Sequence, residues 1–294
     1  MLKRIITSIV ALCVFVPVLI FSDTWIFPIV ISACAVIGVC EMLFCQGFKK
    51  NLFLIIPVSL VASFFPIFTR ITFLKSIGHN IDSLHNLIKL AIGITFIMAL
   101  YIFGVAVFGN KKVNVTDAGL LFSTSFYIIA AFTSIVYIHD YINGGEFIYL
   151  LTFICAWTTD IFAYFTGRFL GKHKLIPAVS PKKTVEGAIG GIAFCIGAVL
   201  LFGFIVERFF NSDNTISANY LVLAISGFFI SVVSQVGDLI MSVIKRHYGI
   251  KDYGKLFPGH GGILDRFDSV LAVSLILAFI CTYFELLPVT TYCV

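Results

Sequence analysis

Cations and carboxylates gather near the C-terminus, in residues 242–268, which read SVIKRHYGIKDYGKLFPGHGGILDRFD. Lys and Arg bind phosphate groups, and Mg²⁺ typically binds through one or two carboxylates together with substrate phosphates. The cations and carboxylates lie beside a turn from Gly259 to Gly262, and glycine allows a backbone to approach a ligand closely. We therefore predict a site for a phosphorylated substrate and a metal ion. The ionisable residues behind this prediction are Lys245, Arg246, Lys251, Asp252, Lys255, His260, Asp265, Arg266 and Asp268.

Three aspartates lie where this segment meets long apolar segments. Asp238 lies near the end of the apolar segment that precedes it, and Asp265 and Asp268 lie at the start of the one that follows. If these segments form antiparallel helices, Asp238 and Asp265 come to a similar depth. Carboxylates at the edge of an apolar span are costly and need a partner, so two of them together predict a bound cation.

Two further acids lie inside apolar segments. Asp160 shares a helical face with Ala163 and Gly167, small residues that permit close packing between helices. Either a structural hydrogen bond to a neighbouring helix or a place beside the active site would explain Asp160, and we favour the second. Glu41 is interpreted as a polar contact between helices and not as a catalytic residue.

A second basic segment, residues 171–187, reads GKHKLIPAVSPKKTVEG. Pro181 limits helix formation before Lys182, and Lys183, Thr184, Glu186 and Gly187 are expected to open the next helix. Backbone N–H groups at a helix start attract phosphate, and neighbouring lysines strengthen that attraction. With the C-terminal segment it would make a cradle for a triphosphate, although a basic loop also attracts anionic lipid head groups.

Long apolar segments must position these loops. Hydrophobic residues make up 60% and charged residues 12% of the 294-residue chain, whereas a soluble domain has about 45–50% and about 25%. Segments of about 20 apolar residues are long enough to cross a bilayer as helices. The sequence predicts an all-α, polytopic integral membrane protein with about nine transmembrane helices. The predicted spans are 5–22, 24–44, 52–69, 87–108, 118–138, 147–166, 187–206, 219–241 and 268–287.

The distribution of Lys and Arg predicts the orientation of the chain. Nine spans with a cytoplasmic N-terminus keep most of the 20 Lys and Arg in the cytoplasm, as the positive-inside rule requires. The C-terminus then lies outside, and the loops 167–186 and 242–267 face the cytoplasm. We divide the chain into N-terminal and middle transmembrane helices, 1–145, and a catalytic transmembrane region, 146–294. The basic residues left outside are Arg70, Lys75, Lys89 and Arg208.

The charged motifs together resemble a known signature. The C-terminal segment contains S-V-I-K-R, then K-D, then P-G-H-G-G-I-L-D-R-F-D. This pattern resembles that of the phosphatidate cytidylyltransferases, also called CDP-diacylglycerol synthases. The resemblance continues upstream around Asp238, in residues 180–187 and around Asp160, so that it covers about residues 155–275. The N-terminal half is similar only in being hydrophobic and rich in spans.

The resemblance implies transfer of the cytidylyl group of CTP to phosphatidate, giving CDP-diacylglycerol and pyrophosphate. The lipid phosphate would attack the α-phosphorus of CTP without a covalent enzyme intermediate, so positioning and charge neutralisation would carry catalysis. The resemblance also implies Mg²⁺ as cofactor, with a monovalent cation as an additional candidate. Asp238 and Asp265 would be the metal ligands, with Asp268 as a third candidate. Asp160 and Glu186 would lie next to the site and order it without binding the metal.

The same resemblance assigns the remaining side chains. Lys245, Arg246 and Arg266 are expected to be catalytic, together with the two metal-binding aspartates. The expected partners are CTP, phosphatidate, membrane lipids and a second copy of the chain in a homodimer, and no nucleic acid. The expected location is a bacterial plasma (inner) membrane, with the active site facing the cytoplasm. The expected substrate-binding residues are Ser180, Lys182, Lys183, Thr184, Lys251, Asp252, His260, Gly261 and Gly262.

Other functions stay open at this point. A CTP-dependent lipid kinase of the polyprenol or dolichol type would use similar groups but release CDP. A proton-coupled transporter could relay protons through Asp160 and Asp238, although the charges gather at one face and no inverted repeat is visible. A scaffold that binds anionic lipid through its basic loops would leave the paired aspartates unexplained.

Overall fold

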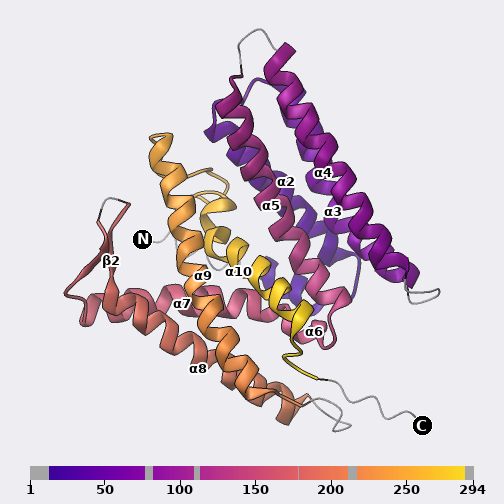
Figure 1. Cartoon of the computed structure of the whole chain (residues 1–294). Coiled ribbons are helices and arrows are strands. Elements are labelled where there is room, and N and C mark those ends of the chain that lie inside the picture. The colour runs from indigo at the N-terminus through magenta and orange to yellow at the C-terminus, as the bar shows by residue number, and fades with distance from the viewer. Residues whose placement is uncertain (1–12, 77–81, 109–112, 178, 211–216, 289–294) are drawn as a thin grey trace. The chain divides into compact units, whose positions relative to one another are not determined.

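The computed structural model describes residues 13–76, 82–108, 113–177, 179–210 and 217–288, and most of them are helical (Figure 1). The predicted all-α class is therefore confirmed, with one short hairpin added. In chain order the elements are α2 (Ile26–Cys45), α3 (Leu52–Ser76), α4 (Asp82–Phe108), α5 (Val115–Tyr141), α6 (Gly145–Ile148), α7 (Leu150–Phe169), β1 (Lys174–Ile176), β2 (Ser180–Thr184), α8 (Val185–Phe209), α9 (Tyr220–His247) and α10 (Leu264–Tyr283).

Seven helices within the described residues are long and apolar enough to cross a membrane, as expected for an integral membrane protein. They coincide with the second to the eighth predicted spans. A bilayer offers the backbone no hydrogen-bond partners, so an apolar chain satisfies its N–H and C=O groups within helices. The last predicted span falls on α10, which begins with charged residues and is not among the seven. The count of nine and the orientation stay predictions. Lys3, Arg4, Lys111, Lys112 and part of the first predicted span, 5–22, lie outside the described residues.

The chain forms two compact units, and the first comprises Met1–Tyr137 and Tyr248–Arg266. In this unit α2 packs against α3, and α3 packs against α4. Helix α5 also reaches α2, because Gln46 Nε2 donates a hydrogen bond to Thr124 Oγ1 at 3.1 Å. The loop that carries the Gly-His-Gly-Gly turn thus belongs to the unit that the N-terminal helices build.

The second unit comprises Ile138–His247 and Phe267–Val294. Here α7 packs along α8, and α8 packs against α9. A Cβ atom added at Gly187 would lie 2.6 Å from the carbonyl oxygen of Ala163. Small residues on the face that carries Asp160 therefore let α7 and α8 approach closely, as predicted. The functional division of the chain at residue 145 stays a prediction.

A two-stranded antiparallel hairpin occupies the loop between α7 and α8 and projects from the end where α7 stops and α8 begins (Figure 1). A residue that precedes proline favours extended backbone. Ile176 and Ser180 each precede a proline, and they pair across the hairpin. Strand β2 runs directly into α8 at Thr184, so Lys183 lies immediately before the start of a helix.

Candidate functional site

The start of α8 is held by its own side chains and by the segment before β1. Thr184 is the N-cap residue, and its hydroxyl accepts a hydrogen bond from the N–H of Gly187 at 3.1 Å. The Val185 N–H donates to the carbonyl oxygen of His173 at 3.0 Å. The Glu186 carboxylate accepts the His173 N–H at 3.2 Å and lies 2.7 Å from its Nδ1 atom. These bonds join both ends of the hairpin segment to one helix terminus.

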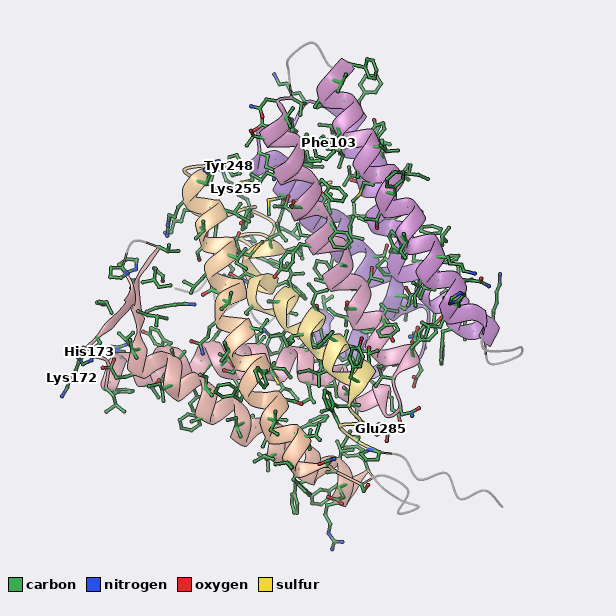
Figure 2. All side chains as sticks on the ribbon, in the orientation of Figure 1. Phe103, Lys172, His173, Tyr248, Lys255 and Glu285 are labelled. Carbon is green, nitrogen blue, oxygen red and sulfur yellow. The ribbon has the colours of Figure 1, made fainter. Side chains whose placement is uncertain are left out.

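These hydrogen bonds limit which groups of the β1–β2 hairpin, called the basic hairpin below, can bind a phosphate. Two of the first-turn N–H groups of α8, those of Val185 and Gly187, already have acceptors within the protein. The expected phosphate contacts therefore fall on the lysine side chains instead of the helix terminus. Figure 2 shows Lys172 and His173 extending outward at the beginning of the hairpin, whereas Lys183, near its end, is only partly exposed.

Lys183 forms an ion pair with Asp238, at 2.5 Å between Nζ and Oδ2. The two side chains come from β2 and α9 and are 25% and 24% exposed. From the sequence, Lys183 is expected to bind phosphate and Asp238 to bind metal. The structure pairs them with each other, which keeps a carboxylate near the end of an apolar helix neutralised.

Asp160 and Asp268 lie near the same ion pair. Asp160 Oδ2 accepts a hydrogen bond from Ser269 Oγ at 2.8 Å, which joins α7 to α10. Asp268 Oδ1 accepts the N–H of Ser269 at 3.0 Å. Electrostatic repulsion couples both carboxylates to Asp238. Asp160 thus makes the structural hydrogen bond considered for it, and it also lies beside the residues predicted to form the site.

These three aspartates, with Lys183 and Lys245, are called the aspartate cluster below. Lys183 attracts Asp160, and Lys245 attracts Asp268. The cluster thus gathers three carboxyl groups and two ammonium groups.

The donor set of the aspartate cluster fits a hard cation such as Mg²⁺, which prefers oxygen ligands. In the described ranges, no three His, Cys, Asp or Glu side chains are placed so that they alone could hold a metal ion. Mg²⁺ usually keeps several waters and takes only one or two protein carboxylates. The cluster therefore suits an ion that is bound jointly with substrate phosphates.

The Gly-His-Gly-Gly segment belongs to the first unit and forms a tight turn. Gly259 and Gly261 have φ angles of 81° and 86°, in the left-handed region that favours glycine. The Phe257 N–H donates to the carbonyl oxygen of Gly261 at 2.8 Å, and the His260 N–H donates to that of Phe257 at 2.8 Å. Backbone conformation alone therefore requires glycine at two of the four positions of the turn.

Asp265 closes this turn. Its Oδ2 atom accepts the N–H of Tyr253 at 2.8 Å and the N–H of Gly262 at 3.0 Å. The residue is only 9% exposed. Asp265 therefore has a structural task that the sequence did not suggest, in addition to its predicted role as a metal ligand.

Glu41 makes the second anchor of the turn. Its carboxylate accepts the N–H of Ile263 at 3.0 Å and the N–H of Leu264 at 2.9 Å. The interpretation of Glu41 as a polar contact between helices is thus correct in kind, and the partner is the start of α10. The sequence offered one signal for this contact, an acid within an apolar span, but nothing that named its partner.

The predicted site residues are divided between the two units. Lys182, Arg246, Lys251, Asp252 and Arg266 are exposed, while Ser180, Lys245, His260 and Gly261 are partly exposed. Figure 2 labels Tyr248 and Lys255, which belong to the loop that connects α9 to α10. Asp238 belongs to the second unit and Asp265 to the first, so their joint binding of a metal ion stays a prediction. The first unit holds Lys251, Asp252, His260, Gly261, Gly262, Asp265 and Arg266, and the second holds Asp160, Ser180, Lys182, Lys183, Thr184, Glu186, Asp238, Lys245, Arg246 and Asp268.

Comparison with known proteins extends the similarity beyond these motifs. A family model described as "Cytidylyltransferase family" matches residues 2–284. A phosphatidate cytidylyltransferase of Staphylococcus haemolyticus is 33% identical over 271 residues, which cover 92% of this chain and 95% of the relative. That of Staphylococcus saprophyticus is 35% identical over 270 residues, with the same coverage. That of Bacillus subtilis is 38% identical over 169 residues, 58% of this chain and 60% of the relative.

Proposed function

The chain belongs to the cytidylyltransferase family, and we propose that it transfers the cytidylyl group of CTP to phosphatidate, giving CDP-diacylglycerol and pyrophosphate. The observation that carries this proposal is similarity over 92% of the chain to relatives named for that reaction. The aspartate cluster and the paired lysine supply the charges that such a reaction needs.

In the proposed reaction, a phosphate oxygen of phosphatidate forms a bond to the α-phosphorus of CTP. The bond from that phosphorus to the oxygen that bridges to the β-phosphate breaks, and pyrophosphate leaves with the bonding electrons. Negative charge grows on the leaving group, so the enzyme must place positive charge there. Lys245, Arg246 and Arg266 are the proposed catalytic cations at these phosphates.

Lys183 is proposed to contact the nucleotide. In the structure its ammonium group neutralises Asp238. A nucleotide phosphate that arrives with a cation offers both partners of the ion pair a new contact, the phosphate for the lysine and the cation for the carboxylate. Long lysine side chains can make this exchange because they rotate about several bonds. The other substrate contacts keep the assignments made for them above, with Thr184 acting through its cap of α8.

Asp238 and Asp265 remain the proposed ligands of Mg²⁺, with Asp268 as a third candidate and a monovalent cation as an additional one. When bound, the metal ion would offset the charge that develops on the phosphate oxygens. Asp160, hydrogen-bonded to Ser269 beside Asp238 and Asp268, is proposed to hold α10 in place. Glu186 is proposed to hold the basic hairpin through His173.

We also propose that the basic hairpin and the loop between α9 and α10 face the cytoplasm of a bacterial cell. The support is the asymmetry of Lys and Arg along the chain. CTP would then reach the site from water, while the acyl chains of phosphatidate stay in the plasma membrane. A homodimer is the proposed assembly, from the resemblance to the family.

The test uses detergent-purified protein with CTP, phosphatidate and Mg²⁺. Lipid-linked CMP and released pyrophosphate are both measured, with EDTA as the control. Metal-dependent CDP-diacylglycerol with an equal amount of pyrophosphate is the expected result. Release of CDP with a phosphorylated lipid alcohol would instead indicate a lipid kinase. Folded protein that forms neither product would overturn the proposed function.

A further inference from the structure

Glu41 is a buried acid near the C-terminal end of the apolar helix α2. It is 7% exposed, and both carboxylate oxygens accept backbone N–H groups. Oε1 binds the Ile263 N–H and Oε2 binds the Leu264 N–H, so one side chain caps the start of α10 from a different helix. A carboxylate at this place also interacts favourably with the positive end of the helix dipole.

The loop between α9 and α10, residues 248–263, is called the signature loop below. Two of its glycines, Gly254 and Gly262, enclose the Glu41 carboxylate. A Cβ atom added at Gly254 would lie 2.1 Å from Glu41 Oε1, and one added at Gly262 would lie 2.0 Å from the same atom. Neither glycine has a positive φ, so backbone conformation does not explain why glycine stands at these two positions. Their lack of a side chain allows the loop backbone to close around Glu41.

The contact is continuous with the contacts of Asp265. Asp265 Oδ2 holds the N–H of Gly262, and Glu41 holds the next two N–H groups along the chain. Three consecutive N–H groups, just before Asp265, therefore end on two carboxylates. Loss of Glu41 would release two of them and let the start of α10 move, and Asp265 and Arg266 would move with it.

We propose that Glu41 is a positioning residue for cytidylyl transfer. It fixes the Gly-His-Gly-Gly turn and the first residues of α10, and it does so without touching substrate or metal. This inference rests on the proposed function. It also gives the N-terminal half of the chain, which the motifs leave out, a direct part in shaping the site.

The first experiment compares Glu41→Gln and Glu41→Ala with the wild type. Glutamine keeps the size of the side chain but turns an NH₂ group toward one of the two N–H donors. Groups that orient metal ligands typically contribute about 10- to 100-fold to metal affinity or activity. We therefore expect kcat to fall and half-saturation by Mg²⁺ to rise by about tenfold each in both variants, with little change in KM for phosphatidate.

The matched control is Ser32→Ala. Ser32 is also buried in α2, and its hydroxyl donates to the carbonyl oxygen of Ser63 at 2.8 Å, away from the signature loop. This variant should keep the kinetic constants of the wild type. A purely structural role for Glu41 would lower the yield of folded protein but leave kcat and Mg²⁺ dependence unchanged per folded molecule, and that result would overturn the proposal.

A second readout does not depend on activity. Hydrogen exchange of the amides of Ile263 and Leu264 should accelerate in Glu41→Ala, whereas helix α2 should keep its protection. Unchanged exchange at both amides would contradict the anchoring. The wild-type assay tests the proposed function, and the ratio of variant to wild type tests Glu41, so the two failures are distinguishable.

A double-mutant cycle tests the enclosure of the carboxylate. Gly254→Ala should reduce kcat because its new methyl group displaces Glu41. In the Glu41→Ala background the clash with the carboxylate is gone and only a close contact with the Cα atom of Gly262, at 3.0 Å, remains, so the double variant should lose less than the product of the two single losses. Residues that act through one contact are non-additive in this way. Independent, multiplicative losses would show that Gly254 acts by another route.

Discussion

Two sets of carboxylates serve the proposed site in different ways. In the first unit, Glu41 and Asp265 accept hydrogen bonds from backbone N–H groups. In the second unit, Asp238 pairs with the side chain of Lys183 and Asp160 with that of Ser269. A backbone partner can be released only if the loop changes its conformation, whereas a side-chain partner can rotate away.

This difference separates the acids that shape the site from the acids that can change partners. The backbone-bound pair defines the turn and the start of α10. In the aspartate cluster, Asp238 and Asp160 have side-chain partners that can be exchanged when a cation arrives, whereas Asp265 would bind a metal ion in addition to holding the turn. Among acids that share one sequence motif, the chemistry of the hydrogen-bond donor therefore indicates which role each one plays.

The largest effect is expected for Asp238→Asn. Loss of the charge removes a proposed metal ligand and the partner of Lys183, and a metal ion supplies several kcal/mol of charge stabilisation in such reactions. Turnover should fall by at least about 100-fold, which corresponds to about 3 kcal/mol. CDP-diacylglycerol formation by purified protein is the measurement, with Glu146→Gln, an exposed acid of the same unit, as the control. Near-normal turnover in Asp238→Asn would remove it from the site.

Asp265→Asn should lose activity and also stability. Its Oδ2 atom accepts two buried N–H groups. Asparagine keeps an acceptor oxygen for them but loses the charge, and a hydrogen bond to a charged group contributes about 1.5–3 kcal/mol against about 0.5–1.5 kcal/mol for a neutral one. A partly exposed ion pair such as Lys183–Asp238 typically contributes about 1 kcal/mol or less. The thermal midpoint of Asp265→Asn in detergent should therefore fall further than that of Asp238→Asn. Equal midpoints would erase the distinction between the two kinds of acid.

Lys183→Ala should weaken the use of CTP. A hydrogen bond to a charged group contributes about 1.5–3 kcal/mol, so KM for CTP should rise by roughly tenfold or more. Lys174→Ala, an exposed lysine of the same hairpin, is the control and should change KM little. If both substitutions weaken activity equally, and added salt has the same effect, the hairpin acts only through its overall charge.

The smallest effect is expected for Thr184→Val, which keeps the volume of the side chain but removes the cap of α8. Loss of an N-cap hydroxyl costs about 1 kcal/mol. The thermal midpoint should fall by a few degrees, and KM for CTP should rise only slightly, since the hairpin is still held through Glu186 and His173. A loss of turnover as large as that of Asp238→Asn would mean that Thr184 contacts substrate directly.

Several features could be predicted from the sequence because the bilayer permits few structures. Seven of the nine predicted spans coincide with long apolar helices, since an apolar chain can satisfy its backbone only within a helix. The family resemblance is confirmed over nearly the whole chain. The hairpin was not predicted, because its strands have three and five residues and carry no alternating pattern.

The sequence by itself determined the class of the protein, its family and the segments that carry charge, because composition and local spacing encode these properties. The tertiary structure alone decided which charges meet. Glu41 and Ile263 are 222 residues apart in the chain. Lys183 lies before α8, and its partner Asp238 lies in the next helix, α9. Such pairings depend on how helices pack, and the energies that select them come from contacts between segments that no local pattern joins.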